Sequence, residues 1–494
     1  MEEVNLMKAT RYEQVADKIL NLIQNGILKE GDRIPSMRQL SSELGVSVNT
    51  VKEAYWTLEK QNHIEAVPQS GFYVKKSAKY HEPSVFDPSL MDPQQVGMCQ
   101  IYGAFQYSGN YSPELNLGLS NIHPDFWPLD KLGKYMQEAL RYHNHDSFSY
   151  IISPGYPELR KQIARMSLSG GMNLNPEEII ITNGCHEAIF LALMTVCKPG
   201  DTLIYESPIY FSSLQLLQRL NLKLIEIPAS EKDGVNLDTL KFVLENHPVK
   251  AMFTISNFNN PLGFAMPDDK KKEMVTLLDK YNVTLIEDDI YGDLYFDTRP
   301  SACKAYDTTG NVIHCSSITK TVSPGLRIGW IAPGEKYFDG INGLKTLLNI
   351  STGAINQIAA ARFLKEGGYD RHMRKLRESL KIQVADVRAC ILENFPEGTK
   401  ITDPEGGTLL WITLPEGIDS LDIYHEALKK NILIAPGCLF SMKPKFNNCL
   451  RISAGYWNEK IRKAIVYLGK LCREYNPNTL KSIPKSESCR ALPE

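Results

Sequence analysis

Apolar positions near the start of the chain predict short helices separated by glycine turns. Over residues 11–25, apolar side chains recur at helical spacing, and Gly26 ends this first helix. Ser36 follows a proline and can cap a second helix that runs to about Leu44, where Gly45 supplies a turn. Two short helices on either side of such a glycine-containing turn are typical of the helix-turn-helix motif.

The helix predicted after this turn has an exposed start and one buried face. Ser47 can cap it, and its first turns carry Asn49, Thr50 and Lys52, which would face bases and phosphates in a major groove. Residues 62–76 then alternate apolar and polar around a Pro-to-Gly turn, which predicts a two-stranded wing. The buried face of the helix is formed by Val51, Ala54, Tyr55 and Leu58.

From residue 179 onward, short apolar runs alternate with helix-length segments. Helices are expected over residues 186–197, 209–220 and 268–281. This alternation predicts an α/β fold with a doubly wound, mainly parallel sheet that carries helices on both faces. The expected strands are residues 179–182, 203–206, 224–227, 252–255, 284–287, 312–315 and 328–331.

The rest of the chain predicts a smaller lobe and two irregular segments. Residues 372–480 form an α+β lobe, with a helix around Leu376 and Leu380 followed by three strands. Residues 77–113 lack periodicity and contain several prolines, so we expect a linker there, and a disordered tail at residues 481–494. The expected domains are therefore a DNA-binding head at 1–76, the linker, and a cofactor-binding domain at 114–480 that includes the lobe.

Composition excludes some classes of protein but does not identify a function. A chain of 494 residues is too long for one core, and no run of about 18 apolar residues predicts a membrane span. Ten cysteines without CxxC or metal-ligand spacing fit free thiols in a reducing cytoplasm, and no metal site is expected. Residues 1–80 hold eleven Lys/Arg and ten Asp/Glu, so DNA binding must be argued from the motif and not from bulk charge.

Lys320 lies in the segment SSITKTVSPGLRIGW, directly after one of the expected strands. A lysine amine can form a Schiff base with an aldehyde cofactor. Ser317 and Arg327 are spaced to bind a phosphate through a hydroxyl and a guanidinium fork. The segment therefore predicts a site for a phosphorylated aldehyde.

Other polar clusters also follow expected strands, where ligands bind in sheets of this type. Asp288 can pair with a pyridine nitrogen, while Asn260 and Tyr291 can hydrogen-bond the ring 3-oxygen. Tyr210 can stack on the ring. Each of these residues alone has an ordinary explanation as a strand end, a turn or a core side chain, but together with Lys320 they predict pyridoxal 5'-phosphate. A helix N-terminus suited to the phosphate is opened by Gly184, Cys185 and His186.

Residues from about Tyr12 to Val74 resemble the winged helix-turn-helix of the GntR superfamily of bacterial regulators. The resemblance is carried by the segments GDRIPSMRQLSSELGVSVNTVKEAYWTLE and PQSGFYV. Many members carry a basic residue where this chain has Val48, which leaves its base preference open. A winged helix used for protein contacts, or retained without a role, is the alternative. The resemblance implies contacts with double-stranded DNA from Ser36, Arg38, Ser47, Asn49, Thr50, Lys52 and Gly71.

Residues from about Leu115 to Leu471 resemble the fold-type I aminotransferases. The resemblance implies that Lys320 is the Schiff-base lysine and that Arg451, in CLRISA, holds the α-carboxylate of an amino acid. It also implies that Tyr150 reaches the phosphate in the other subunit of a homodimer. The chain departs from the family pattern at Cys185-His186, where Ser or Ala followed by Gln is commoner, and at Gly170, where an Arg is often found.

A GntR-type head joined to an aminotransferase-like body resembles the MocR/GabR-type subfamily of GntR transcriptional regulators. That resemblance implies a cytoplasmic, DNA-binding regulator that senses an amino acid or amine through an external aldimine at Lys320. Two alternatives stay open, because binding and turnover use the same residues. The chain could be a pyridoxal-phosphate-dependent aminotransferase with an accessory DNA-binding head, or a sensor of the cofactor itself.

Overall fold

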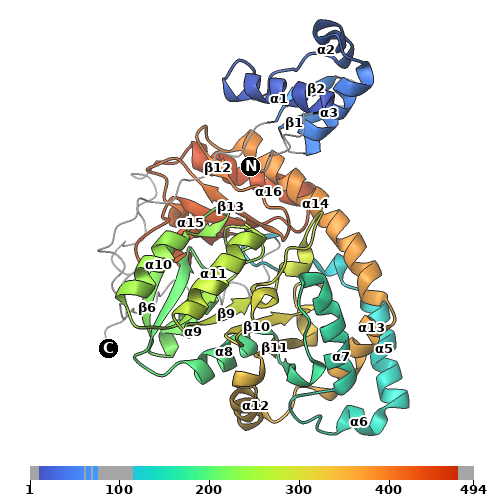
Figure 1. The fold of residues 1–494 in the computed structure, drawn as a ribbon, viewed down its shortest axis with the longest axis vertical. Coiled ribbons are helices and arrows are strands. Elements are labelled where there is room, and N and C mark those ends of the chain that lie inside the picture. Colours follow the sequence, from blue (N-terminus) through green and yellow to red (C-terminus); the bar gives the residue numbers. More distant parts are fainter. Residues whose placement is uncertain (1–9, 30, 61–62, 68–69, 76–114, 477–494) are drawn as a thin grey trace, which may run out of the picture. The chain divides into compact units, whose positions relative to one another are not determined.

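The computed structural model describes residues 10–29, 31–60, 63–67, 70–75 and 115–476. The chain divides into two compact units, residues 1–79 and 80–494 (Figure 1). The expected linker at 77–113 and the expected tail at 481–494 lie outside the described residues. We therefore describe each unit by itself.

The N-terminal unit is a winged helix-turn-helix, as predicted. Ser36 Oγ accepts from the Gln39 amide at 3.3 Å and Ser47 Oγ from the Thr50 amide at 3.1 Å, so both serines cap the helices assigned to them. Gly45 between those helices has φ +61°, a left-handed conformation that glycine adopts without strain. The elements are α1 (Arg11–Gln24), α2 (Met37–Leu44), α3 (Val48–Lys60) and an antiparallel wing of β1 (Ile64–Val67) and β2 (Gly71–Val74).

The larger unit is built on an eight-stranded sheet with the order β4-β11-β10-β9-β8-β5-β6-β7. Its central strands are parallel, while β11 runs antiparallel to both neighbours and β7 antiparallel to β6. All seven expected strands are present, and β7 is an addition at one edge. The bounds are β4 (Ile180–Thr182), β5 (Thr202–Ser207), β6 (Lys223–Ser230), β7 (Gly234–Val235), β8 (Val249–Thr254), β9 (Thr284–Asp288), β10 (Val312–Ser317) and β11 (Gly329–Ala332).

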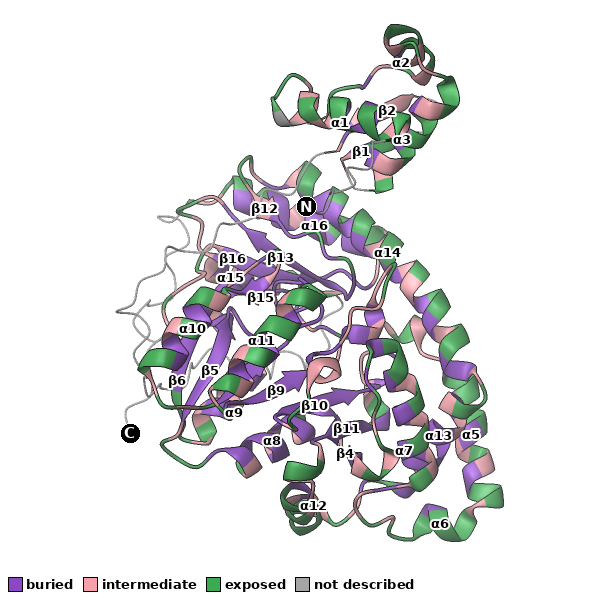
Figure 2. Cartoon of the chain, in the orientation of Figure 1, coloured by how far each residue is buried: buried purple, intermediate pink, exposed green. Residues whose placement is uncertain are grey.

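Both faces of this sheet are buried (Figure 2). Successive residues along a strand point to opposite faces, and the two faces pack into two different hydrophobic clusters. Leu285 on β9 packs with α10 (Leu237–Asn246) and α11 (Asp268–Lys280). Its neighbour Ile286 packs with α8 (Cys185–Val196) and α13 (Ala354–Lys365). The remaining helices of this domain are α5 (Leu129–Tyr142), α6 (Asn144–Phe148), α7 (Pro157–Ser167), α9 (Phe211–Arg219) and α12 (Glu335–Asn349).

The smaller lobe is entered through the long helix α14 (Gly368–Asn394), in which Leu376 and Leu380 are buried as expected. A strand that the sequence did not predict, β3 (Leu115–Asn116), pairs with β14 (Ile432–Leu433), so the first described residues of this unit also belong to the lobe. No helix in the described part of the chain is long and apolar enough to cross a membrane. The other elements of the lobe are β12 (Lys400–Ile401), β13 (Leu409–Thr413), β15 (Ala435–Pro436), β16 (Cys449–Ser453), α15 (Ser420–Leu428) and α16 (Glu459–Arg473).

Candidate functional site

Side chains from several loops meet at the carboxyl ends of the parallel strands, around a cavity of about 190 Å³. Asp288 ends β9, and Lys320 follows β10 by three residues. Since β9 and β10 are neighbouring parallel strands, the sheet itself brings these two residues together. The lining includes Ser120, Cys185, His186, Tyr210, Asn260, Asp288, Tyr291, Thr319, Lys320 and Arg327.

Lys320 carries the nucleophilic amine of the cavity. Its Nζ donates to Oδ1 of Asn121 at 2.9 Å and to Oγ of Ser120 at 3.4 Å. Desolvation, assisted by the Arg451 charge, lowers the pKa of Lys320 from 10.5 to about 8. The neutral amine, which attack on an aldehyde requires, is therefore far more populated near pH 7 than in an ordinary lysine.

Asp288 is a buried carboxylate without a cationic side chain beside it. Its Oδ1 accepts from the thiol of Cys185 at 3.1 Å and from the Ile290 amide at 3.1 Å. Among the described residues, no Lys or Arg forms an ion pair with it. Desolvation raises the pKa of Asp288 from 3.8 to about 6. A protonated heterocyclic nitrogen would supply the missing positive charge.

Arg327 and the N-terminus of α8 form a cradle on another side of the cavity. Nη2 of Arg327 donates to the Asn183 carbonyl at 2.6 Å, and a Cβ on Gly184 would lie only 2.5 Å from that nitrogen. Gly184 also has φ +90°, so glycine is required here for two reasons. His186 lines the cavity, and desolvation, followed by the Arg327 charge, lowers its pKa. A guanidinium beside free helix amides is suited to a phosphate.

Ser317 is not part of the cavity lining. It is buried, and its hydroxyl accepts from the Thr319 amide at 3.2 Å. It lines a small neighbouring cavity with Asp289 and Thr321, while Thr319 faces the cavity of Lys320. The phosphate contact that the sequence assigned to Ser317 stays a prediction, and Thr319, two residues further on, is a hydroxyl of the cavity lining.

Arg451 is fully buried and contacts Asn260 of the cavity lining. Nη1 donates to Oδ1 of Asn260 at 2.9 Å, and Nη2 donates to the Gly118 carbonyl. Its Nε has no hydrogen-bond partner, and no acidic side chain of the described residues pairs with the guanidinium. The rings of Phe211 and Phe440 lie 5.7 and 5.2 Å from it. A buried cation of this kind is suited to an anionic ligand group.

Asn260 and Tyr291, the two residues expected to hydrogen-bond the ring 3-oxygen, contact each other. Nδ2 of Asn260 lies 3.2 Å from the Tyr291 hydroxyl, which lies 2.9 Å from Oγ of Ser120. Tyr210 lines the cavity beside Phe211, with ring centroids 4.7 Å apart. Sequence reasoning missed Ser120 and Asn121, because they precede Lys320 by about 200 residues and carry no motif of their own.

Tyr150 does not reach the cavity of its own chain. Its side chain is 76% exposed. A role in a neighbouring subunit, as the resemblance implies, is compatible with this exposure. Within one chain it belongs to the surface.

The residues expected to contact DNA are all on the N-terminal unit. Arg38, Asn49 and Lys52 are exposed, and Val48, at the first position of α3, is 44% exposed. Gly71 begins the second wing strand with φ +122°. Ser36 and Ser47 cap helices, and Thr50 lies 2.9 Å from the Ser47 hydroxyl, so these three also have structural roles.

Comparisons with known proteins agree with this two-part architecture. Residues 114–468 match the family of class I and II aminotransferases, and residues 11–74 match the bacterial regulatory proteins of the gntR family. The HTH-type transcriptional regulator YjiR of Escherichia coli K12 is 37% identical over 93% of this chain and 98% of its own length. The chain belongs to the MocR/GabR-type subfamily of GntR regulators. The fold class predicted for both parts is confirmed.

The body of this MocR/GabR-type regulator is also similar to enzymes. Aromatic-amino-acid aminotransferase 1 of Thermococcus litoralis is 30% identical over 71% of this chain and 86% of its own length. The body is also similar to the crystal structure of Pyrococcus horikoshii kynurenine aminotransferase in complex with PMP, with a TM-score of 0.71 and 26% sequence identity. The match covers 79% of this chain and 97% of the aminotransferase chain. The regulator therefore has the complete scaffold of an aminotransferase.

Proposed function

We propose that this regulator binds DNA through its head and holds pyridoxal 5'-phosphate at Lys320, where an amino acid or amine replaces the lysine as the bound amine. The observation that carries the proposal is that Lys320 and Asp288 line one cavity. One supplies a partly neutral amine and the other a buried carboxylate that lacks a cation.

The residues present fit this cofactor. Asp288 would pair with the ring nitrogen, and Arg327 with the α8 amides would bind the phosphate in the cradle that a Cβ on Gly184 would fill. Tyr210 would pack on the ring, and Asn260 and Tyr291 would hydrogen-bond its 3-oxygen. When bound, the cofactor supplies an aldehyde that exchanges amines and a ring that accepts electrons.

Arg451 is the group that would recognise the effector's carboxylate. Among the described residues, its Nε–H has no acceptor, and one N–H of its Nη2 donates to the Gly118 carbonyl. A carboxylate that binds this side of the guanidinium would take both donors in a bidentate contact. If it takes the N–H that the Gly118 carbonyl accepts, it would displace that carbonyl, and with it the segment that places Ser120 and Asn121 beside Lys320. Effector binding would thus move the segment that contains Gly118, which follows the lobe strand β3 directly.

Exposed apolar residues near Tyr150 support a homodimer. Phe148 is 82% exposed and Ile152 is 62% exposed. Ile152 forms a β-bridge with Ser351, which follows α12, and Leu347 lies in the last turn of that helix. Leu347 is 84% exposed. A second copy of the chain would cover this surface and bring Tyr150 to its phosphate cradle. A regulator of chromosomal DNA would work in the cytoplasm.

An alternative function is that of an aminotransferase with an accessory DNA-binding head. The similarity to solved aminotransferases and the intact Lys320 favour it, because a released lysine amine can move a proton at the substrate α-carbon. The two functions make different predictions about turnover and DNA.

The test combines a spectral screen with DNA binding. Cofactor-saturated protein and its Lys320→Ala variant are titrated with a panel of amino compounds. Affinity for the DNA upstream of the protein's own gene is measured with and without each compound. We expect one class of compound to change both the absorbance and the DNA affinity of the wild type, and Lys320→Ala to lose the DNA response. Turnover above about 1 per second with no specific DNA site would show an enzyme instead.

A further inference from the structure

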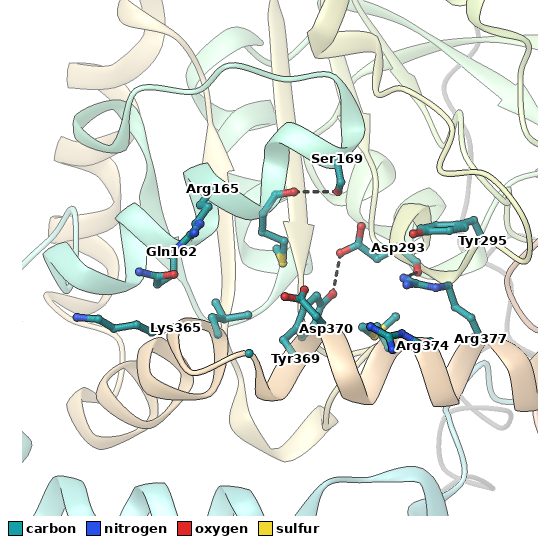
Figure 3. Close-up of a pocket in the computed structure, with 14 residues that line it drawn as sticks. Gln162, Arg165, Ser169, Asp293, Tyr295, Lys365, Tyr369, Asp370, Arg374 and Arg377 are labelled. Atoms are coloured by element: carbon teal, nitrogen blue, oxygen red, sulfur yellow. Dashed lines mark hydrogen bonds between the residues drawn. The ribbon is translucent and has the colours of Figure 1, made fainter.

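A second cavity, of about 560 Å³, lies apart from the Lys320 site. Its residues come from α7, from the 3₁₀ turn η6 (Gly292–Leu294), from the end of α13 and from the start of α14 (Figure 3). A volume of this size is within the range of sites for small molecules. Four basic side chains line it, namely Arg165, Lys365, Arg374 and Arg377.

Two of these cations have no partner in the described part of the chain. Arg165 on α7 and Arg374 on α14 are exposed and form neither a hydrogen bond nor an ion pair through their side chains. Figure 3 shows them on the two helices that border the cavity. Arg377 is held in place, because its guanidinium donates to the Asp293 carbonyl at 3.2 Å and lies 4.0 Å over the Tyr295 ring.

The acidic residues of the cavity do not balance this charge. Asp293 is already paired with a cation outside the cavity lining, since its Oδ1 accepts from Nε of Arg299 at 2.9 Å, and its Oδ2 accepts from the Tyr369 hydroxyl at 2.7 Å. Lys365 pairs with Glu158 at 3.1 Å. Asp370 is the one other acidic residue of the lining. The cavity therefore keeps an excess of positive charge on facing helices.

We propose that this cavity binds a small, multiply charged anion that carries phosphate or carboxylate groups. Guanidinium groups on both sides can bind such groups by charge-assisted, bidentate hydrogen bonds. Met166, Leu364 and Met373 also line the cavity and suit the carbon skeleton of a metabolite. This apolar lining favours a small molecule over a duplex, whose phosphates present no apolar group at the same depth.

Two series of contacts lead from this cavity to the Lys320 site. His372, on the same turn of α14 as Arg374, donates from Nε2 to the carbonyl of Thr321 at 2.6 Å, and Thr321 adjoins Lys320. Asp293 is joined through Arg299 to Asp289, with the second ion pair at 2.7 Å, and Asp289 adjoins Asp288. An anion that draws α14 towards α7 would therefore act on Thr321 and Asp289, which adjoin Lys320 and Asp288.

The experiment uses the full chain saturated with pyridoxal 5'-phosphate, so that the phosphate cradle at Arg327 is filled. Pyrophosphate and citrate are titrated calorimetrically as probes. We expect saturable binding of at least one of them, with one site per chain. Arg165→Gln and Arg374→Gln should each weaken it about tenfold, the loss of one charge-assisted contact. Lys375→Gln, on the same helix but outside the cavity lining, removes the same charge and should leave the affinity unchanged.

Preference for one probe over the other identifies phosphate or carboxylate as the group recognised. The proposal is overturned if neither probe binds saturably, or if Lys375→Gln weakens binding as much as the cavity variants. It is also overturned if Arg374→Gln lowers the affinity for DNA while neither probe binds, because the basic residues would then serve nucleic acid. All three side chains are exposed, and unchanged melting temperatures will show that the variants fold.

Discussion

Oδ1 of Asn260 accepts a hydrogen bond from Nη1 of Arg451 at 2.9 Å. The other end of the same amide, Nδ2, lies 3.2 Å from the Tyr291 hydroxyl, so both ends of the side chain are engaged and its orientation is fixed. Asn260 thereby joins the residue proposed to bind an effector carboxylate to the residue proposed to contact the cofactor ring. A movement of Arg451 would therefore be passed through one side chain, that of Asn260, to the residues proposed to contact the cofactor ring.

Replacement of Gly184 by alanine tests the phosphate cradle. Gly184 and Gly200 have φ of +90° and +89°, but a Cβ at 184 would lie 2.5 Å from Nη2 of Arg327, whereas a Cβ at 200 would meet nothing within 4 Å. Both alanine variants should lose roughly 1–3 kcal/mol of unfolding free energy through backbone strain. Only Gly184→Ala should also lose cofactor affinity, by about tenfold or more, in a fluorescence titration. Equal cofactor affinity in the two variants would contradict the cradle.

Asp288→Asn should have opposite effects on stability and on cofactor binding. The raised pKa of Asp288, about 6 against 3.8, means that the folded protein binds this proton more tightly than the unfolded chain. The stability of the cofactor-free protein therefore falls as pH rises from about 4 to 6. At pH 7 the Asn variant should be more stable than wild type by up to about 3 kcal/mol in urea denaturation, and the difference should vanish near pH 4.

The same Asp288 variant should bind the cofactor more weakly, because an amide cannot neutralise a pyridinium. Asp289→Asn is the matched control. Asp289 is paired with Arg299 at 2.7 Å, so its loss leaves a buried cation and should destabilise the protein at pH 7. If Asp288→Asn also destabilised the cofactor-free protein at pH 7, the carboxylate would have a cation that the structure does not show.

The capture of the cofactor by Lys320 should depend on pH. Since desolvation lowers the pKa of this amine to about 8, its neutral, nucleophilic form predominates above that pH. In stopped-flow absorbance, the rate of capture should rise with pH and level off above about 8. Lys320→Arg should show no capture at any pH. A midpoint near 10.5, the ordinary value for lysine, would contradict the desolvated environment.

Lys52 should contribute to DNA affinity without selecting sequence. It is exposed near the start of α3, and a phosphate contact there would make Lys52→Ala bind all DNA sequences more weakly and reduce the salt dependence by about one ion. Asn49→Ala should instead reduce discrimination between sequences. Lys60→Ala, at the other end of the same helix, is the control and should bind as wild type in fluorescence anisotropy.

Much of the fold and of the site could be predicted from local patterns. Ser36 and Ser47 were expected to cap helices because a serine hydroxyl satisfies free helix amides, and both do so. Lys320 and Asp288 were expected to meet because each follows an apolar strand, and the ends of neighbouring parallel strands share one edge of a sheet.

What the sequence by itself determined, then, is the order of the elements, the strand-end residues of the Lys320 cavity and the family. The tertiary structure alone decided which distant residues join them. Asn121 accepts from Lys320, the Gly118 carbonyl accepts from Arg451, Ser317 lines a neighbouring cavity, and Arg165 and Arg374 line a second, larger one. These arrangements depend on how the lobe and the helices pack on the sheet. Periodicity along the chain indicates which face of a helix or strand is buried, but not which other element packs against that face.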